Sequence, residues 1–139
     1  MEATECLLND EVRIVCVTAK SFPAGIMEAF ETLEKVHPSI SDKAFYGISY
    51  MNAKGEIVYK AAAEENFEGE GEQLGLETFV IPKGEYLSKT VYEFLKNPQQ
   101  IGEVFRSLLA DPRLDTTVPC VERYKGMDEV QCMVKIKTD

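Results

Sequence analysis

Apolar and polar residues follow one another along this chain in a pattern that occurs twice. Each half begins with a β-rich run, continues with an amphipathic helical segment and closes with two further β-rich runs joined by a turn. In the first half the strand, the helix and the hairpin are predicted at 12–17, 23–36, and 45–51 with 56–63. In the second half they are predicted at 77–81, 98–110, and 120–124 with 129–137. The pattern therefore predicts two successive strand–helix–strand–strand modules.

One such module alone leaves a sheet edge and an apolar sheet face uncovered, so two modules are expected to pair. We predict an α+β fold in which both modules form one curved antiparallel sheet with two helices about a pseudo-twofold axis. The 139 residues, 45% of them apolar, fit a single domain with modules at about 11–63 and 76–137. The acidic, glycine-rich stretch 64–75 is predicted to be a solvated connection, and residues 1–10 a frayed lead-in.

The charge of the chain narrows the classes of function. A net charge of −9 argues against direct nucleic-acid binding, because phosphate contacts need clustered lysines and arginines. The same charge suits a cationic ligand or a basic protein surface. No apolar run approaches the length of a membrane span, and the N-terminus lacks the pattern of a signal peptide. The sequence therefore predicts a soluble, cytoplasmic protein.

The sequence offers few groups for metal, cofactor or nucleophilic chemistry. Its four cysteines (Cys6, Cys16, Cys120 and Cys132) are widely spaced, and His37 is its one histidine. A zinc site would lack its usual ligands, so reduced cysteines that pack as small apolar residues are expected. No glycine-rich nucleotide loop and no G-x-S-x-G motif occur. We therefore predict no metal, no cofactor and no catalytic residue.

The segment PCVERY at 119–124 carries the strongest indication of a binding site. In an extended strand, Cys120, Glu122 and Tyr124 point to one side. A carboxylate on a covered face needs a partner, so a desolvated Glu122 would attract a cationic or hydrogen-bond-donating ligand. Two structural alternatives stay open at this stage: the face is exposed, or Glu122 pairs with an Arg or Lys of the chain.

Aromatic residues on the predicted strands are the second ingredient of this site. Tyrosines on a cleft wall offer an apolar face and a hydroxyl, and their rings attract cations. Tyr50 and Tyr124 are predicted to occupy corresponding places in the two hairpins. Tyr46 and Phe79 are predicted to add to the walls, although strand aromatics also serve as plain core residues. The predicted ligand-binding set is Glu122, Tyr124, Tyr50, Tyr46, Phe79 and Cys120.

The layout, the IPKGEY turn at 81–86 and the PCVERY strand at 119–124 resemble the GyrI-like small-molecule-binding domains. These are also called AraC-type, or bacterial transcription activator, effector-binding domains. The resemblance covers roughly residues 11–137. It implies a central cleft for amphipathic, often cationic or aromatic compounds, with Glu122 matching the glutamate at its heart. Family members are often fused to helix–turn–helix domains, and no pattern of such a module is visible in this sequence.

The leading hypothesis is a stand-alone, non-enzymatic binding module for an amphipathic small molecule, linked to transcriptional regulation or drug response. Stand-alone members of the family include a DNA gyrase inhibitor, so one alternative is a protein-interaction module that binds a partner through the acidic surface. Some relatives hydrolyse electrophilic natural products. The second alternative is therefore a hydrolase in which Glu122 activates water and Tyr124 donates a hydrogen bond.

Overall fold

The computed structural model describes residues 3–22, 24–37, 45–94, 96–125 and 128–137. Within them the chain divides into two compact units. Unit 1 consists of Met1–Asp10 and Pro82–Asp139, and unit 2 consists of Glu11–Ile81. Each unit combines antiparallel strands with helix, which confirms the α+β class. The single domain, and the joint sheet about a pseudo-twofold axis, stay predictions.

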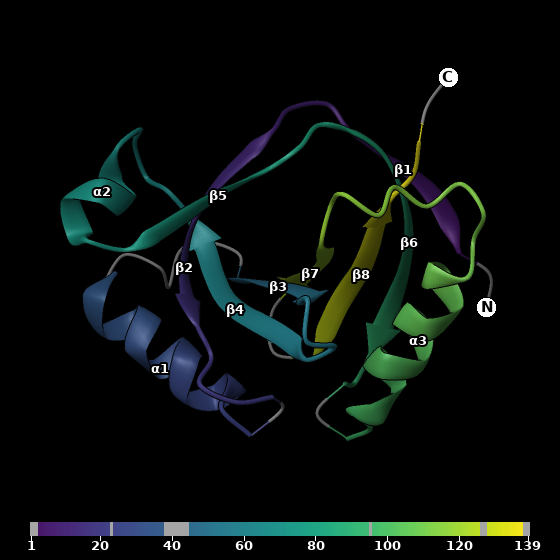
Figure 1. Ribbon diagram of the computed structural model, residues 1–139, viewed down its shortest axis with the longest axis horizontal. Helices are drawn as coiled ribbons and strands as arrows, with labels where there is room; N and C mark the ends of the chain where they lie inside the picture. Colours follow the sequence, from purple (N-terminus) through teal and green to yellow (C-terminus); the bar gives the residue numbers. More distant parts are fainter. Residues whose placement is uncertain (1–2, 23, 38–44, 95, 126–127, 138–139) are drawn as a thin grey trace. The chain divides into compact units, whose positions relative to one another are not determined.

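Unit 2 packs a helix on one face of a four-stranded sheet. Its elements are β2 (Val12–Thr18), α1 (Ile26–Val36), β3 (Phe45–Met51), β4 (Ile57–Glu64), α2 (Glu70–Leu74) and β5 (Glu77–Ile81). The strand order is β3-β4-β2-β5, so β2 is a central strand, as its apolar residues on both faces predict. Ala29 and Leu33 of α1 pack against Val15, Ala61 and Ala63 of the sheet. Figure 1 shows α1 alongside β2. The predicted helix start at Pro23 lies outside the described residues.

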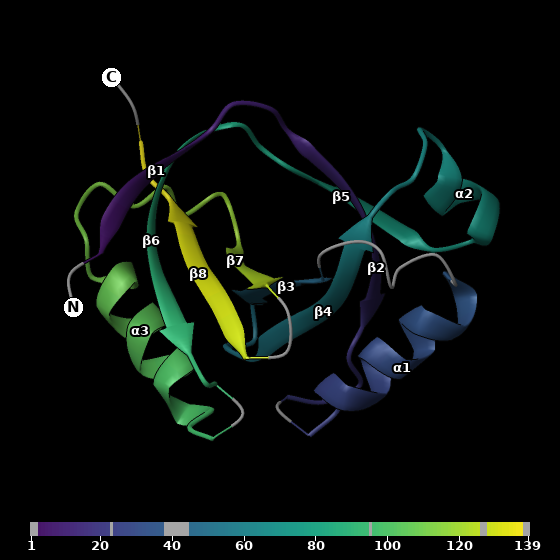
Figure 2. The same ribbon diagram turned by 180° about the vertical axis from the view of Figure 1, so that it is seen from behind.

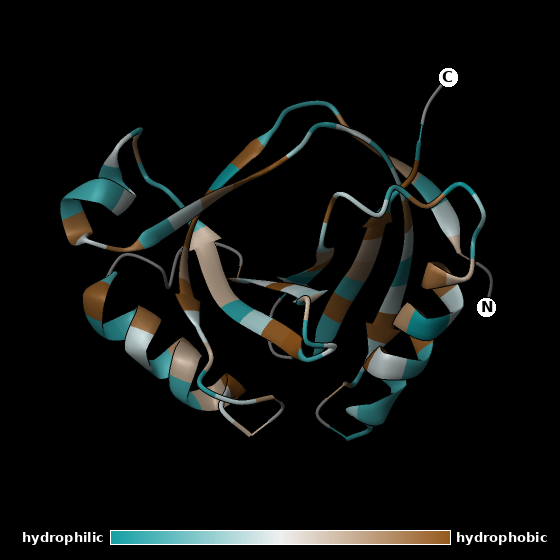
Figure 3. Cartoon of the chain, in the orientation of Figure 1, coloured by the Kyte–Doolittle hydropathy of each residue, from teal (hydrophilic) through white to brown (hydrophobic). Residues whose placement is uncertain are grey.

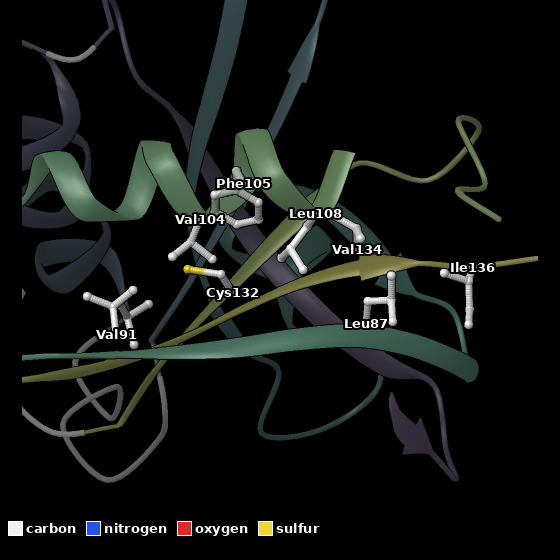
Figure 4. Packing of buried hydrophobic residues seen from close by; sticks show 9 residues of the cluster. Leu87, Val91, Val104, Phe105, Leu108, Cys132, Val134 and Ile136 are labelled. Carbon is white, nitrogen blue, oxygen red and sulfur yellow. The ribbon is translucent and has the colours of Figure 1, made fainter. Parts of the chain in front are cut away.

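Unit 1 repeats this plan. Its elements are β1 (Thr4–Leu8), β6 (Gly84–Tyr92), α3 (Gln99–Leu109), β7 (Cys120–Lys125) and β8 (Glu129–Lys135). The strand order is β1-β6-β8-β7. Helix α3 covers one sheet face, and Figure 2 shows it beside β6 and β8. The helix contributes Val104, Phe105 and Leu108 to the core, and Figure 4 shows Val104 next to Cys132 of β8.

Both strand–helix–strand–strand modules are present, as β2-α1-β3-β4 and β6-α3-β7-β8. Two short strands differ from the prediction. Residues 4–8 form β1, which pairs with β6, so the predicted frayed lead-in is wrong. Residues 77–81 form β5, which pairs with β2 of unit 2, so the second module begins with β6 instead. Backbone pairing decides both cases, because an edge strand gains its hydrogen bonds from a neighbour that is distant in sequence.

The acidic stretch 64–75 is a folded part of unit 2, and the prediction of a solvated connection is wrong there. It contains α2, which Figure 3 colours mostly as hydrophilic. Glu70, the first residue of α2, is 9% exposed. Its Oε1 atom lies 3.0 Å from Nε2 of the buried His37. Asn66 donates to Glu70 from its backbone and from its side chain. Burial favours a raised pKa for Glu70, but the hydrogen bonds from Asn66 and the neighbouring His37 bring that pKa below its usual range.

The IPKGEY turn at 81–86 fixes the start of β6. Gly84 has a φ of 136°, which residues with a side chain rarely adopt. Tyr86 is fully buried, and its hydroxyl donates a 2.7 Å hydrogen bond to the carbonyl oxygen of Pro82. Burial, with a smaller contribution from Asp115, raises the pKa of Tyr86 to about 12. The motif therefore has a clear structural role in unit 1.

Candidate functional site

Glu122 lies on the face of unit 1 that α3 covers. Its neighbours on that face, Cys120 and Tyr124, pack against the cluster that includes Val104, Phe105 and Leu108. Side chains two apart in a strand share a face, and Glu122 also pairs directly with Cys132 of that cluster. Glu122 is only 7% exposed. The predicted alternative of an exposed face is therefore wrong. The carboxylate stands among apolar side chains, and Lys89 of β6 lies on the same face, since it also pairs with Cys132.

The carboxylate of Glu122 accepts a hydrogen bond from Tyr124. The distance from the Tyr124 hydroxyl to Oε1 is 2.6 Å, which is typical of a hydroxyl donating to a charged oxygen. The Tyr124 ring meets Phe94 edge-on, with ring centroids 5.4 Å apart and planes at 62°. This packing fixes the ring whose hydroxyl holds Glu122, so the carboxylate has a defined orientation.

The charge of Glu122 acts on the thiol beneath it. Burial raises the pKa of Cys132 to about 12, and the nearby Glu122 and Cys120 contribute to the rise. A thiol with that pKa stays protonated at neutral pH and serves as core, as the sequence predicts for a cysteine in a strand. Burial disfavours the charged thiolate, and the negative charge of Glu122 disfavours it further.

The other predicted site residues lie in unit 2, on the sheet face that points away from α1. Phe45 packs against the α1 core, so Tyr46, which follows it in β3, points to the opposite side, and Tyr50 shares the face of Tyr46. Phe79 pairs with Ile14, whose neighbour Val15 faces α1. The structure therefore groups Tyr46, Tyr50 and Phe79 on one face.

The two hairpins do not place their tyrosines alike. Tyr50 faces away from α1, whereas Tyr124 faces α3. In the strand pairing, Tyr124 is opposite Val130, while the residue on the helix-covered side of β3 at that end is Ser49, opposite Tyr59. The prediction that Tyr50 and Tyr124 occupy corresponding places is therefore wrong. A shift of one residue along a strand moves a side chain to the other face, and the sequence pattern did not fix that register.

Unit 2 also holds a charged cluster that the sequence pattern did not reveal. Lys60 of β4 forms an ion pair with Glu77 of β5, and Thr18 donates to the same carboxylate at 3.1 Å. The Lys60 ammonium also lies 5.8 Å from the centre of the Tyr50 ring. Burial favours a lower pKa for Lys60, but the hydrogen bond to Glu77 and its charge raise it above its usual range. Finding this cluster required the pairing of β5 with β2, whereas the sequence pattern predicted β5 as the start of the second module.

Three aromatic contacts were also missed. Phe94 follows β6 outside any periodic segment, so nothing in the sequence pattern connects it with Tyr124. On the α1 side of unit 2, Tyr59 is buried, and its ring centroid lies 6.0 Å from Phe22 and 6.4 Å from Phe30. Because side chains two apart in a strand share a face, the alternation with Ala61 and Ala63 could have indicated that Tyr59 faces α1.

Metal ligands do not gather in the part of the chain that the structure describes: no three His, Cys, Asp or Glu side chains lie together there. Among the described helices, none combines the length and the apolar character needed to cross a membrane. The groups around Glu122 that could bind a ligand are its own carboxylate as acceptor, the Tyr124 hydroxyl as donor and the apolar surface of the core.

The comparisons with known proteins place this fold among solved structures. No protein-family model matches the chain, and no curated protein matches it. SAV2435 bound to tetraphenylphosphonium is similar with a TM-score of 0.68 and 12% identity, covering 99% of this chain and 94% of SAV2435. A Staphylococcus aureus MU50 protein described as a bacterial transcription regulation protein is similar with a TM-score of 0.69 and 12% identity, covering 99% of each chain. A hydrolase from Listeria innocua is similar with a TM-score of 0.63 and 11% identity. The match covers 98% of this chain and 92% of the hydrolase chain. These likenesses show a shared fold.

Proposed function

We propose that the chain is a binding module for an amphipathic, cationic, aromatic small molecule, and that Glu122 supplies the charge that holds it. The observation that carries this proposal is the place of the carboxylate. Glu122 is 7% exposed on the helix-covered face of unit 1 and is oriented by a 2.6 Å hydrogen bond from Tyr124. A buried carboxylate is costly to desolvate, and a ligand cation beside it offsets that cost.

The chemistry of the face favours a delocalised cation over a compact one. An ammonium ion is strongly hydrated, whereas a cation whose charge is spread over aromatic groups loses less hydration when it meets apolar surface. The rings of Tyr124 and Phe94 can contact such a ligand through dispersion and through their π faces. Cys120 is half-buried on the same face and completes the apolar rim. Tyr46, Tyr50 and Phe79 stay predicted wall residues.

Two structural neighbours support this proposal in different ways. SAV2435 was solved with tetraphenylphosphonium, a monocation surrounded by four phenyl groups. The Staphylococcus aureus protein supports a link between this fold and transcription regulation. We infer that the module senses or captures such compounds, and that any effect on transcription passes through a DNA-binding partner.

The test is a calorimetric titration of tetraphenylphosphonium into the wild type, Glu122→Gln and Glu103→Gln. Glu103 lies exposed on α3 and provides the same change of charge away from the site. Removing a charge-assisted contact should weaken binding about 10- to 100-fold in Glu122→Gln, roughly 1.4–2.8 kcal/mol. Glu103→Gln should bind like the wild type. Equal affinities in all three proteins would exclude Glu122 as the binding carboxylate.

A hydrolase is the second candidate, and the contact between Glu122 and Tyr124 favours it. The carboxylate would accept a proton from water as the water oxygen attacks a strained carbon. The phenol, which has one proton, would turn it from Glu122 to the departing oxygen. Styrene oxide is a suitable probe, because its ring C–O bond opens to give a diol. Turnover in the wild type that disappears in both Glu122→Gln and Tyr124→Phe would support hydrolysis. If tetraphenylphosphonium binds but no diol forms, the hydrolase is excluded and the binding function is retained.

A further inference from the structure

Arg123 follows Glu122 in β7 and therefore points to the opposite face of the sheet of unit 1. Its Nε atom is buried, and within the described part of the chain that atom has no hydrogen-bond partner. Buried donors in proteins are nearly always satisfied, and each exception needs a physical explanation. The guanidinium of Arg123 carries a positive charge and offers several N–H donors.

Arg123 belongs to a row of three polar side chains that crosses the sheet. It pairs with Gln131 of β8, and Gln131 pairs in turn with Thr90 of β6. Leu87 and Val91 face α3, so Thr90 faces away from that helix, as Arg123 and Gln131 do. Side chains opposite one another on neighbouring strands lie about 5 Å apart. The row therefore gathers a guanidinium, an amide and a hydroxyl, all able to donate, and all three residues are partly buried.

The rows on either side of this one differ from each other. On one side Val121, Met133 and Ser88 form a buried border, with exposed fractions of 0%, 2% and 5%. On the other side Lys125 pairs with Glu129. The carboxylate of that row therefore stands opposite a lysine. The row of Arg123 is thus a half-buried strip of donors between a buried border and a pair of opposite charges.

One contact within the strip indicates that its donors have spare capacity. Nε2 of Gln131 lies 3.9 Å from Sγ of Cys6, and a thiol sulfur is a weak acceptor. An oxyanion would be a far better acceptor for this amide and for the guanidinium. A carboxylate is planar and matches the fork of N–H groups on arginine, so it can accept two parallel hydrogen bonds.

We propose that the sheet face of unit 1 opposite α3 holds a subsite for the carboxylate of a small molecule, with Arg123 as its anchor and Gln131 and Thr90 as flanking donors. This subsite is separate from the cation site proposed at Glu122, because the two residues point to opposite faces. The two charges would give one strand two specificities: a cation on the helix-covered side and an oxyanion on the other. A phosphate group offers similar acceptors, so the test compares both.

The experiment follows the Nε–Hε resonance of Arg123 by ¹H–¹⁵N correlation spectroscopy while sodium benzoate is added to the intact chain. Benzamide serves as the neutral analogue of the same shape, and inorganic phosphate as the second oxyanion. Arg123→Gln removes the anchor. Arg106→Gln removes an equal charge from the exposed side of α3 and is the matched control. The titration of the wild type tests for carboxylate binding next to Arg123 even if Arg123→Gln does not fold.

The proposal predicts a saturable benzoate shift of the Arg123 resonance, no shift with benzamide, and binding at least tenfold weaker in Arg123→Gln but unchanged in Arg106→Gln. Saturation by phosphate at lower concentration than by benzoate would replace the carboxylate by a phosphoryl group as the ligand and overturn the assignment. The absence of a shift, or equal weakening in both variants, would overturn the subsite. Failure here leaves tetraphenylphosphonium binding at Glu122 untouched, so the two proposals fail separately.

Discussion

Units 1 and 2 share the order of their strands and the place of their helix, yet they put charge on different sheet faces. In unit 2 the face under α1 is built from small apolar residues such as Ala61 and Ala63, and the Lys60–Glu77 ion pair lies on the other face. In unit 1 the helix-covered face itself carries Glu122. The charge of Lys60 on the face away from α1 is paired with Glu77, so it has a structural explanation. Charge inserted under a helix is costly, and it is the stronger indication of function.

The largest expected effect tests whether the two helix-covered cores are independent. Leu108 of α3 is 2% exposed and Leu33 of α1 is fully buried. Leu108→Ala and Leu33→Ala should each lower the free energy of unfolding by about 2–5 kcal/mol, because both leave a cavity. Hydrogen exchange should show the loss in unit 1 for the first variant and in unit 2 for the second. Equal loss of protection in both units from either variant would mean that the cores unfold together.

A smaller effect tests the packing that sets unit 2 apart, its acidic helix α2. A Cβ atom on Gly71 would lie 2.3 Å from Cγ2 of Thr78 and 3.0 Å from Cγ1 of Val15. Gly71→Ala should therefore destabilise unit 2 by about 1–3 kcal/mol through overpacking. Gly102 of α3 has open space around its Cα, so Gly102→Ala should stabilise unit 1 by about 0.5–1 kcal/mol. Chemical denaturation that gives the same sign for both variants would contradict this difference.

The buried pair of Glu70 and His37 makes the stability of unit 2 depend on pH. The pKa of Glu70 is below its ordinary value of 4.5, so its ionisation stabilises the fold above that pH and the gain is lost as pH falls through the folded pKa. Glu70→Gln should be about 1–2 kcal/mol less stable than the wild type at pH 7, because charged acceptors form the stronger hydrogen bonds. The gap should narrow below about pH 4.5. Glu72→Gln, exposed on α2, is the control and should follow the wild type at every pH.

The smallest effect concerns Glu122 itself. A glutamine at this position keeps an acceptor oxygen for the Tyr124 hydroxyl and removes a buried charge. Glu122→Gln should therefore change the free energy of unfolding by less than about 1 kcal/mol, or raise it slightly. A loss of several kcal/mol in thermal unfolding would assign Glu122 a structural role as an ion-pair partner.

Local sequence patterns were enough to predict the two modules. The partners of the edge strands and the register of the hairpins could not be predicted in this way. The alternation of Val130, Cys132 and Val134 and the stripe of α3 predicted the helix and final hairpin of unit 1. The same alternation predicted the shared face of Cys120, Glu122 and Tyr124. Local pattern could not predict the partner of an edge strand or the register of a hairpin, since both depend on distant residues.

Those two gaps explain most of the corrections. Strand β5 carries the partner of Lys60, and its assignment to the second module hid that ion pair. The register of β3 turned Tyr50 away from α1. Composition also misled for 64–75, where glycine and glutamate residues indicated solvent exposure. A buried histidine with a hydrogen-bonded Glu70 made that stretch part of the fold.

The most direct test of the cation site compares two ligands of the same shape and opposite charge. Tetraphenylphosphonium and tetraphenylborate each carry four phenyl groups around a central atom. Calorimetric titration of the wild-type chain in sodium buffer should show saturable binding of the phosphonium and at least tenfold weaker binding of the borate. Apolar contact alone would bind both ligands equally, whereas a carboxylate under α3 selects the cation. Equal affinity for the two ligands, or tighter binding of the borate, would contradict the central role given to Glu122.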